Sequence, residues 1–572
     1  MLGLTRHSLL KWLSAACIAA APALALAQAP AKAAPAKAPA VNTSTCTTCH
    51  ANIGEFTTSG KHKSVSCAAC HEGLDKHLND PKSRPATDMN PAKCGSCHEP
   101  QFKTMYKADT DHKVARFEKK LATGPAPNPF FDWALGPHGF TREHNLPRAH
   151  SFAALDQFVV DRAFGGRFQP KEGWLYTGSQ GGHFKVWDVL KDGYPDNSDQ
   201  KVFKPGTAAA ANPVCWTCKS TDLILDWAYM GDPVPGATWS RTSKVVDLVK
   251  QVNHSVNCNF CHDPHAAKPR IVRDALIQAV TRTDIPSLYS EDPKRTPVAV
   301  KDLGLRGFTR KIGMLPQYDG KLQCGQCHVE YNCNPGVDPK TGAPITMADR
   351  RTNVFPFVDV TKIDEFYATI NFKDFRHGTT QALLTKMQHP DTEIYWNSKH
   401  DKAGVQCAAC HMPKVKDAKT GKTYTSHWAT SPKNYVKETC LTCHTDKNEA
   451  QMKAVMTSMQ AHYQGKIRAA EGWMQQLFMA FDQARLAGVD DAVLVEARKQ
   501  HSIAHTNWEW WTAANGAAFH NLDQAKTSLA KSITASQEGI KILKEGIAAK
   551  QKAATVAAAP AAAPAAAPAE KK

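Results

Sequence analysis

The feature that most constrains this chain is the pattern C-x-x-C-H, which occurs seven times among its 572 residues. Two thiols followed directly by a histidine form the attachment signature of c-type haem, in which the thiols bond the porphyrin and the histidine binds the iron. Seven copies in one chain argue against reading these cysteines as disulfides or zinc ligands. The motifs are Cys46/Cys49/His50, Cys67/Cys70/His71, Cys94/Cys97/His98, Cys258/Cys261/His262, Cys324/Cys327/His328, Cys407/Cys410/His411 and Cys440/Cys443/His444.

An eighth site departs from the pattern, because Cys215 and Cys218 are followed by Lys219. A lysine amine binds metal only when it is neutral, so the iron must lower its pKa. One unusual ligand among eight predicts an iron with an open opposite side, whereas irons held by two histidines suit electron transfer. The alternative is a dithiol that has lost its haem ligand. The eight sites leave only Cys17 and Cys333 outside them.

Residues 1–27 have the layout of a secretory signal peptide, in which Arg6 and Lys11 precede an apolar run that ends in small residues. The run is short for a bilayer span, although an uncleaved anchor is the alternative. We therefore predict a periplasmic protein with no membrane span in its mature chain. The net charge of +17 would be offset by the propionates of eight haems, so we expect no nucleic-acid partner.

Composition and motif spacing divide the rest of the chain. Residues 28–44 are rich in Ala, Pro and Lys, which is typical of a flexible linker. Residues 45–145 carry three motifs and predict an N-terminal three-haem electron-transfer domain, whereas residues 146–445 carry five and predict the catalytic domain. Residues 446–548 have helical periodicity, and the low-complexity residues 549–572 predict a disordered tail. The expected class is a mainly α multihaem cytochrome c with little β structure and long C-terminal helices.

The Lys219 site and the segments around it resemble the ammonia-forming cytochrome c nitrite reductases. The resemblance covers residues 147–520, and its strength lies in the order of the segments, since each alone is a weak signal. Three additional N-terminal motifs, and a Cys333 two residues after Tyr331, point to the octahaem branch of that family. The matching segments are Pro147–His150 with Asp156 and Arg162, Pro213–Ser220, Cys324–Tyr331, Lys386–Pro390 with His400, Cys407–Lys414 with His427, and Gly516–Asn521.

The resemblance implies a dissimilatory nitrite reductase that reduces nitrite to ammonia, with hydroxylamine and sulfite as candidate further substrates. It implies that Lys219 holds the catalytic iron, that Arg162 and His389 bind the substrate oxygens, and that His389 and Tyr331 donate protons. In the octahaem branch the Tyr331 ring would be bonded to the Cys333 sulfur. The alternative for each residue is a structural role. Arg162 would then lie beside a haem propionate, and Arg148 or Arg167 would bind the substrate in its place. His389 would be an axial ligand, and Tyr331 and Cys333 would be packing residues.

Seven haems with two histidine ligands need seven distal histidines, and the resemblance supplies four of them. For the three N-terminal haems the sequence offers only candidates, among which we favour His62 and His77, then His112, over His138 and His144; His505 is expected to pack. The four implied pairs are His150 with His328, His400 with His444, His427 with His262, and His520 with His411.

The resemblance also implies a calcium site formed by the side chains of Glu330 and Gln388 and the carbonyls of Tyr331 and Lys386. Oxygen ligands of this kind suit a hard cation. The implied cofactors are thus eight haem c groups and Ca²⁺. The implied partners are nitrite, an unidentified quinol-linked or cytochrome electron donor, and further copies of the chain in a dimer or hexamer built through the C-terminal helices.

Two other functions compete with this interpretation. One is a different octahaem redox enzyme, such as a tetrathionate reductase or a hydroxylamine oxidase. The other is a non-enzymatic electron carrier, for which every iron would be capped on both sides. The segments Gln388–Pro390 and Val329–Tyr331 favour nitrite reduction over tetrathionate reduction and hydroxylamine oxidation.

Overall fold

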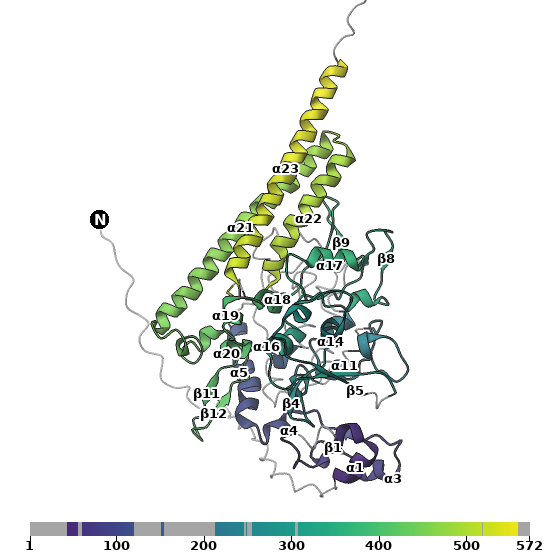
Figure 1. Ribbon diagram of the computed structural model, residues 1–572, viewed down its shortest axis with the longest axis vertical. Coiled ribbons are helices and arrows are strands. Elements are labelled where there is room, and N and C mark those ends of the chain that lie inside the picture. Colours follow the sequence, from purple (N-terminus) through teal and green to yellow (C-terminus); the bar gives the residue numbers. More distant parts are fainter. Residues whose placement is uncertain are drawn as a thin grey trace, which may run out of the picture.

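The computed structural model describes residues 43–54, 60–118, 150–153, 212–244, 248, 254–303, 307–516 and 519–558. The predicted signal peptide, residues 28–42 of the predicted linker and Arg162 lie outside them. Helices dominate the described residues, strands are short, and three long C-terminal helices project from one end of the molecule (Figure 1). The mainly α class with long C-terminal helices is therefore confirmed.

The N-terminal part consists of short turns built on the haem motifs, followed by one longer helix. Polar caps start two of these turns, because Ser66 Oγ accepts a hydrogen bond from the Ala68 amide and Asn90 Oδ1 accepts one from the Ala92 amide. This part lies at the end of the molecule opposite to the long helices (Figure 1). Its elements are α1 (Thr43–Cys49), η1 (Cys67–Ala69), β1 (His71–Glu72), α3 (Leu74–Asn79), β2 (Ala86–Thr87), α4 (Pro91–Gly95) and α5 (Glu99–Glu118).

The central part is a series of short helices and strand pairs. Within the described residues the largest sheet has four antiparallel strands in the order β3-β4-β6-β5. Its strands are β3 (His262–Asp263), β4 (Lys268–Ile271), β5 (Ala299–Asp302) and β6 (Lys311–Met314). The remaining strands pair as β7 (Gly336–Val337) with β8 (Pro344–Ile345), β9 (Phe375–Arg376) with β10 (Leu383–Leu384), and β11 (Lys414–Lys416) with β12 (Thr423–Thr425).

The helices of the central part are short because haem motifs and turns interrupt them. They are η4 (His150–Phe152), α10 (Pro213–Trp216), α11 (Thr221–Leu225), η7 (Tyr229–Gly231), α13 (Cys258–Cys261), α14 (Asp274–Thr281), α15 (Leu288–Glu291), α16 (Gly320–Gln323), η8 (Cys324–Gln326), η9 (Arg350–Thr352), α17 (Ile363–Thr369), α18 (Asp391–Tyr395), α19 (Lys399–Lys402), α20 (Cys407–His411), η10 (Pro432–Asn434) and η11 (Cys440–Thr442).

The C-terminal helices are α21 (Glu449–Leu486), α22 (Asp491–Ala513) and α23 (Leu522–Ala558). A capping box between Asn448 and Gln451 starts α21. The three helices share a buried apolar core that includes Leu477 and Leu543, and a second core joins them to the central part. They therefore form the wall against which the central part packs. None of the described helices combines the length and the apolar character that a membrane crossing requires.

Residues 549–558 differ from the expectation of a disordered tail, because α23 continues through Ala558. This segment is rich in Ala, Lys and Gln, which have high intrinsic helix propensity. The helix ends two residues before Pro560, as expected from the restriction that proline imposes on the residue before it. The predicted boundary at 549 was therefore wrong, and residues 559–572 lie outside the described ones.

Candidate functional site

A connected cavity of about 3590 Å³ runs between the haem motifs. It is several times larger than a pocket for one small ligand, which occupies about 300–1,000 Å³. Cysteines and histidines from the three N-terminal motifs, from the Cys258, Cys324 and Cys407 motifs, and Cys218 with Lys219 all line it. These motifs therefore face one shared interior with room for a row of large cofactors.

Each of the seven motif histidines faces a second histidine, with the ring centroids 6.1 to 6.4 Å apart. An iron between two imidazoles needs about this spacing, since two metal–nitrogen bonds of about 2.1 Å add to about 1.1 Å from each nitrogen to its ring centre. The residues present therefore fit bis-histidine haem. The pairs are His50 with His77, His98 with His62, His71 with His265, His328 with His150, His262 with His427, His444 with His400, and His411 with His520.

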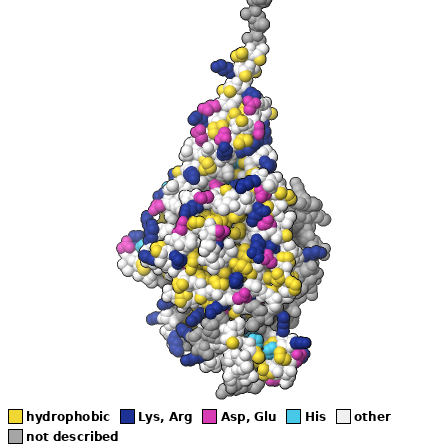
Figure 2. All heavy atoms as spheres, turned by 45° about the vertical axis from the view of Figure 1, so that its right-hand side comes forward, with side chains coloured by type: hydrophobic (Ala, Val, Ile, Leu, Met, Phe, Trp, Pro, Cys, Tyr) yellow, Lys and Arg dark blue, Asp and Glu magenta, His cyan; other side chains and the backbone are white. Residues whose placement is uncertain are grey.

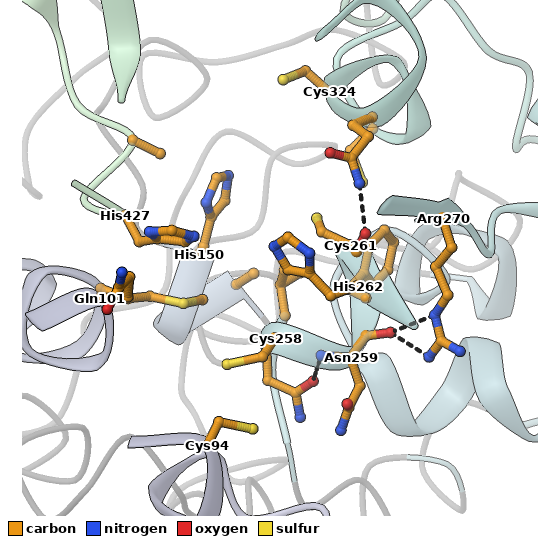
Figure 3. Close-up of a pocket in the computed structure, with 18 of the residues that line it drawn as sticks. Cys94, Gln101, His150, Cys258, Asn259, Cys261, His262, Arg270, Cys324 and His427 are labelled. Atoms are coloured by element: carbon orange, nitrogen blue, oxygen red, sulfur yellow. Dashed lines mark hydrogen bonds between the residues drawn. The ribbon is translucent and has the colours of Figure 1, made fainter. Parts of the chain in front are cut away.

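Hydrogen bonds orient several of these rings. The Nδ1 atom of His62 lies 2.8 Å from the Pro264 carbonyl oxygen, and that of His427 lies 2.9 Å from the Thr425 carbonyl oxygen. A carbonyl can only accept, so Nδ1 carries the hydrogen and Nε2 keeps the lone pair that a metal requires. Burial, followed by the charge of the facing His427, lowers the pKa of His262 to about 4, which favours the neutral imidazole. Figure 3 shows His262 and His427 approaching one another from different segments beside Cys258 and Cys261.

The structure brings together the four histidine pairs that the resemblance implied, and it places the favoured candidates His77 and His62 opposite His50 and His98. The seventh pair differs from the expectation. His71 faces His265, whereas the side chain of His112 lies outside the described ones. The sequence does carry a signal for His265, because it follows the motif histidine His262 by three residues. The candidates named for the N-terminal haems were all histidines near the N-terminal motifs.

The last motif, Cys440–His444, differs from the others in its surroundings. Cys443, which the sequence predicts as a haem-binding cysteine, is exposed, as are Cys49 and Cys97 of the N-terminal motifs, but of the last motif only Thr442 is among the described residues that line the cavity. The reason is its position in the turn between η11 and the start of α21, where Thr442 and His444 are exposed as well. A haem attached through Cys443 would therefore have an edge at the surface and not inside the shared cavity, although His444 still faces His400.

Hydrogen bonds and electrostatic interactions between cysteines of different motifs indicate the order of the motifs in space, which the sequence left open. The first three motifs follow one another, and the third contacts the Cys258 motif, which leads to the Cys324 motif. From Cys324 one branch leads to the Lys219 site and the other runs through Cys407 to Cys440. The neighbouring thiols are Cys46 with Cys67, Cys70 with Cys94, Cys94 with Cys258, Cys261 with Cys324, Cys327 with Cys218, Cys324 with Cys407, and Cys410 with both Cys440 and Cys443.

The Lys219 motif lies against the segment that contains Tyr331 and Cys333. Asn212 caps α10 by accepting from the Cys215 amide at 3.2 Å, and its side-chain amide donates to the Cys333 carbonyl at 2.5 Å. The Sγ atoms of Cys215 and Cys333 are 3.5 Å apart. Tyr331 is buried, and its ring centroid lies 5.9 Å from that of His389, which lines the same cavity as Lys219. Four of the five predicted catalytic residues are thus neighbours, and the fifth, Arg162, lies outside the described residues.

Asn515 orients His389 and was missed by the sequence analysis. Its side-chain amide lies 3.3 Å from His389 Nδ1 and donates to Asp391 Oδ2 at 2.8 Å. Because the amide nitrogen is a donor, His389 Nδ1 accepts and the ring hydrogen sits on Nε2. Burial opposes ionisation of Asp391, but its contacts with His328, His520 and Asn515 outweigh burial and hold the pKa of this carboxyl below its ordinary value.

Glu330, one of the predicted calcium ligands, has a buried side chain with other carboxyl groups nearby. Glu330 Oε2 accepts a hydrogen bond from the Gln388 backbone amide at 2.7 Å, and Oε1 accepts one from the Tyr367 hydroxyl at 3.2 Å. Burial and the nearby carboxyl groups of Glu393, Glu509 and Asp374 raise the pKa of Glu330 well above its ordinary value, against the effect of the Gln388 amide. Glu393 Oε2 and Asp374 Oδ1 are buried and make no hydrogen bond within the described structure. An acidic, oxygen-rich cluster of this kind fits a hard cation.

Residues 173–572 match the family model of cytochrome c552. The chain belongs to this family. It is 28% identical over 385 residues to the cytochrome c nitrite reductase subunit NrfA of Nitratidesulfovibrio vulgaris, covering 65% of this chain and 66% of that protein. It is 25% identical over 406 residues to cytochrome c-552 of Haemophilus influenzae, covering 69% of this chain and 63% of that protein. Each match spans less than two thirds of the relative's own length.

A solved structure shares the fold. Cytochrome c nitrite reductase from Desulfovibrio desulfuricans, a structure described with two calcium sites in its catalytic subunit, superposes with a TM-score of 0.51 at 20% identity. The superposition covers 78% of this chain and 87% of that one. The family resemblance inferred from the motifs is therefore confirmed, and haem c is the cofactor that a multihaem cytochrome c of this kind carries.

The three N-terminal motifs precede the part of the chain that matches the cytochrome c552 model, yet they pack closely against it. His71 faces His265, Cys94 contacts Cys258, and the His427 amide donates to Thr104 Oγ1 at 2.9 Å. The N-terminal motifs thus extend the cavity of the family part.

Proposed function

We propose that this cytochrome c552-family protein is a periplasmic nitrite reductase that forms ammonia at a haem attached to Cys215 and Cys218. The observation that carries the proposal is the contrast between the motifs. Seven motif histidines each face a second histidine, whereas the motif that ends in Lys219 lies beside the buried pair Tyr331 and His389. The relative from N. vulgaris named as a cytochrome c nitrite reductase supports the same reaction.

The side chains around this motif suit a reaction in which nitrite takes up six electrons and eight protons and leaves as ammonium and two water molecules. When bound, the haem supplies the metal centre and the electrons. Lys219 Nζ would hold the iron, His389 holds a hydrogen on the nitrogen opposite Asn515, and the Tyr331 hydroxyl is a second proton donor. The Arg162 guanidinium supplies a permanent positive charge for the nitrite oxygens.

The other seven motifs supply this site with electrons through bis-histidine haems, which brings the proposed total to eight. In the order of their thiols the Cys324 motif is the last stage before Lys219, and we infer that electrons enter at the N-terminal end. A quinol-linked or cytochrome donor would reduce the N-terminal haems. Exposed apolar side chains on α21, Met479 and Leu486 (90% exposed), support self-association into a dimer or hexamer.

The test is turnover by the full, haem-loaded chain after reduction with dithionite and methyl viologen. Nitrite is expected to disappear with formation of ammonium in equal amount, and hydroxylamine to be reduced as well. Tetrathionate reduction or hydroxylamine oxidation without activity on nitrite would favour a different redox enzyme. A carrier would show only low-spin haem, whereas the proposed enzyme has a high-spin signal that shifts when nitrite or cyanide is added.

Calcium binding at Glu330 gives a second prediction. Replacing Glu330 with glutamine keeps the shape but removes the charge, so we expect loss of one bound calcium per chain and a fall in nitrite turnover of about tenfold. Metal analysis and turnover with and without EGTA measure both effects. Glu545→Gln, at an exposed position on α23, is the matched control. Unchanged calcium content in the Glu330 variant would contradict the site.

A thioether between Tyr331 and Cys333 is the third prediction. Cys333 is buried next to Cys215, and once Cys215 is bonded to haem, Tyr331 is the partner proposed for the Cys333 sulfur. The peptide that carries both residues is expected to be lighter by two hydrogen atoms than its sequence requires, and Cys333→Ser is expected to restore the full tyrosine mass. Alkylation of Cys333 in the denatured, haem-loaded protein would show a free thiol instead.

A further inference from the structure

We propose that His265 is the distal ligand of the haem attached at Cys67 and Cys70, and that the loop His262–Ala267 positions histidines for three haems. The proposal rests on haem attachment at the motifs and does not depend on the nitrite reaction. The family model matches residues 173–572, so it does not include the Cys67 motif and assigns no ligand to its haem.

The geometry of His265 matches that of the other distal histidines. Its ring centroid lies 6.2 Å from that of His71, and the two ring planes are 13° apart. His71 Nδ1 lies 3.1 Å from Thr87 Oγ1, which leaves His71 Nε2 for a metal. A surface histidine with a purely structural role would not need this alignment.

Asp263 holds the loop in the shape that presents His265. Its Oδ1 accepts from the backbone amides of His265 at 2.9 Å and Ala266 at 2.8 Å, and its Oδ2 accepts from Arg270 Nη1 at 2.9 Å. The Asp263 carboxyl is buried and also lies 3.7 Å from His265 Nδ1. A carboxylate behind a metal-binding histidine fixes the ring and strengthens its donor nitrogen. Asp263 is therefore a positioning residue for His265.

The same loop orients the ligand of a second N-terminal haem. The Pro264 carbonyl accepts from His62 Nδ1 at 2.8 Å, and the His62 ring faces that of His98 at 6.1 Å. The segment before His62 is pressed against the loop, because a Cβ atom at Gly60 would lie 2.5 Å from the Ala266 carbonyl oxygen. His62 therefore reaches its position only where glycine permits this approach.

Neighbouring residues of the loop His262–Ala267 thus provide or orient histidines for three motifs. His262 belongs to its own motif, the Pro264 carbonyl orients the partner of His98, and His265 faces His71. Histidine side chains gather at the surface of the molecular end opposite to the helical projection (Figure 2). Of the three N-terminal motifs, the Cys67 motif consequently cannot complete its coordination without the family part of the chain, and the Cys94 motif relies on it to orient His62.

The test is the haem spin state of His265→Ala in the full chain. We expect one additional high-spin haem per chain in low-temperature EPR and magnetic circular dichroism, and recovery of the low-spin signal when imidazole is added. Intact mass must show the same number of attached haems as the native protein. His462→Ala, at an exposed position on α21, is the matched control and is expected to leave the spectra unchanged.

A second variant keeps the proposal testable if the alanine variant loses a haem. His265→Met retains a ligand and is expected to raise the midpoint potential of one haem, since a Met/His pair has a higher potential than two histidines. Spectropotentiometry measures this shift. An unchanged high-spin count in fully loaded His265→Ala, or unchanged potentials in His265→Met, would overturn the proposal. Neither readout involves nitrite, so failure of the enzymatic proposal would leave these results interpretable.

Discussion

Replacing Lys219 with alanine is expected to lower nitrite turnover by about 100-fold or more, because loss of even an outer partner of a metal ligand costs about 10–100-fold. The Lys219 amine is the predicted protein ligand on the proximal side of the catalytic iron. Without it that iron loses its proximal ligand, while the seven bis-histidine haems keep their ligands. The measurement is ammonium formation per chain in the reduced protein.

The controls separate ligand loss from loss of the haem itself. Intact mass must show every haem still attached through Cys215 and Cys218. Lys219→His regenerates the common C-x-x-C-H motif, keeps an iron ligand, and is expected to retain more activity than the alanine variant. Lys526→Ala removes an exposed lysine on α23 and is expected to have no effect. Native turnover in a fully loaded Lys219→Ala protein would show that the amine is not the ligand that the site depends on.

The local parts of the fold and of the site were predictable from the sequence. Haem attachment depends on residues that are adjacent in the chain, so the motifs alone gave the cofactor and the Lys219 exception. The long helices followed from the helical periodicity of residues 446–548. The distal histidines His150, His400 and His520 followed from a resemblance in which the order of the segments carries the information.

The parts that were not predictable depend on contacts between distant segments. His265 lies far from His71 in sequence, and only the folded loop brings the rings together. Asn515 acts on His389 from the end of α22, a position that has no signature of its own. The exposure of Cys443 depends on where its turn meets α21, which the motif itself does not encode. The extension of α23 was missed because low complexity was taken as disorder although the residues are good helix formers.

Replacing His389 with alanine is expected to lower kcat/KM for nitrite by about 10²–10³-fold, which is typical for removal of one proton donor or one charge-stabilising group. His389 is buried, its ring lies 5.9 Å from that of Tyr331, and Asn515 keeps the hydrogen on Nε2. Its loss removes the donor while leaving the haem motifs intact. His462→Ala on α21 is the control, and the high-spin signal of the variant must match that of the native protein.

Asn515→Leu tests whether the orientation of His389 matters in addition to its presence. The leucine side chain has a similar size but cannot donate to His389 Nδ1 or to Asp391 Oδ2, so the ring loses the contact that fixes its tautomer, whereas the backbone amide still donates to Asp391 Oδ1. We expect a fall of about tenfold in kcat with a changed pH profile, since outer partners of functional groups contribute about 10–100-fold. In the double variant with His389→Ala the Asn515 change should have no further effect, because its target is gone. If instead the two changes lower kcat independently, so that their effects multiply, Asn515 acts through Asp391. The Asp391 carboxylate also contacts His328 and His520 at two other haem sites.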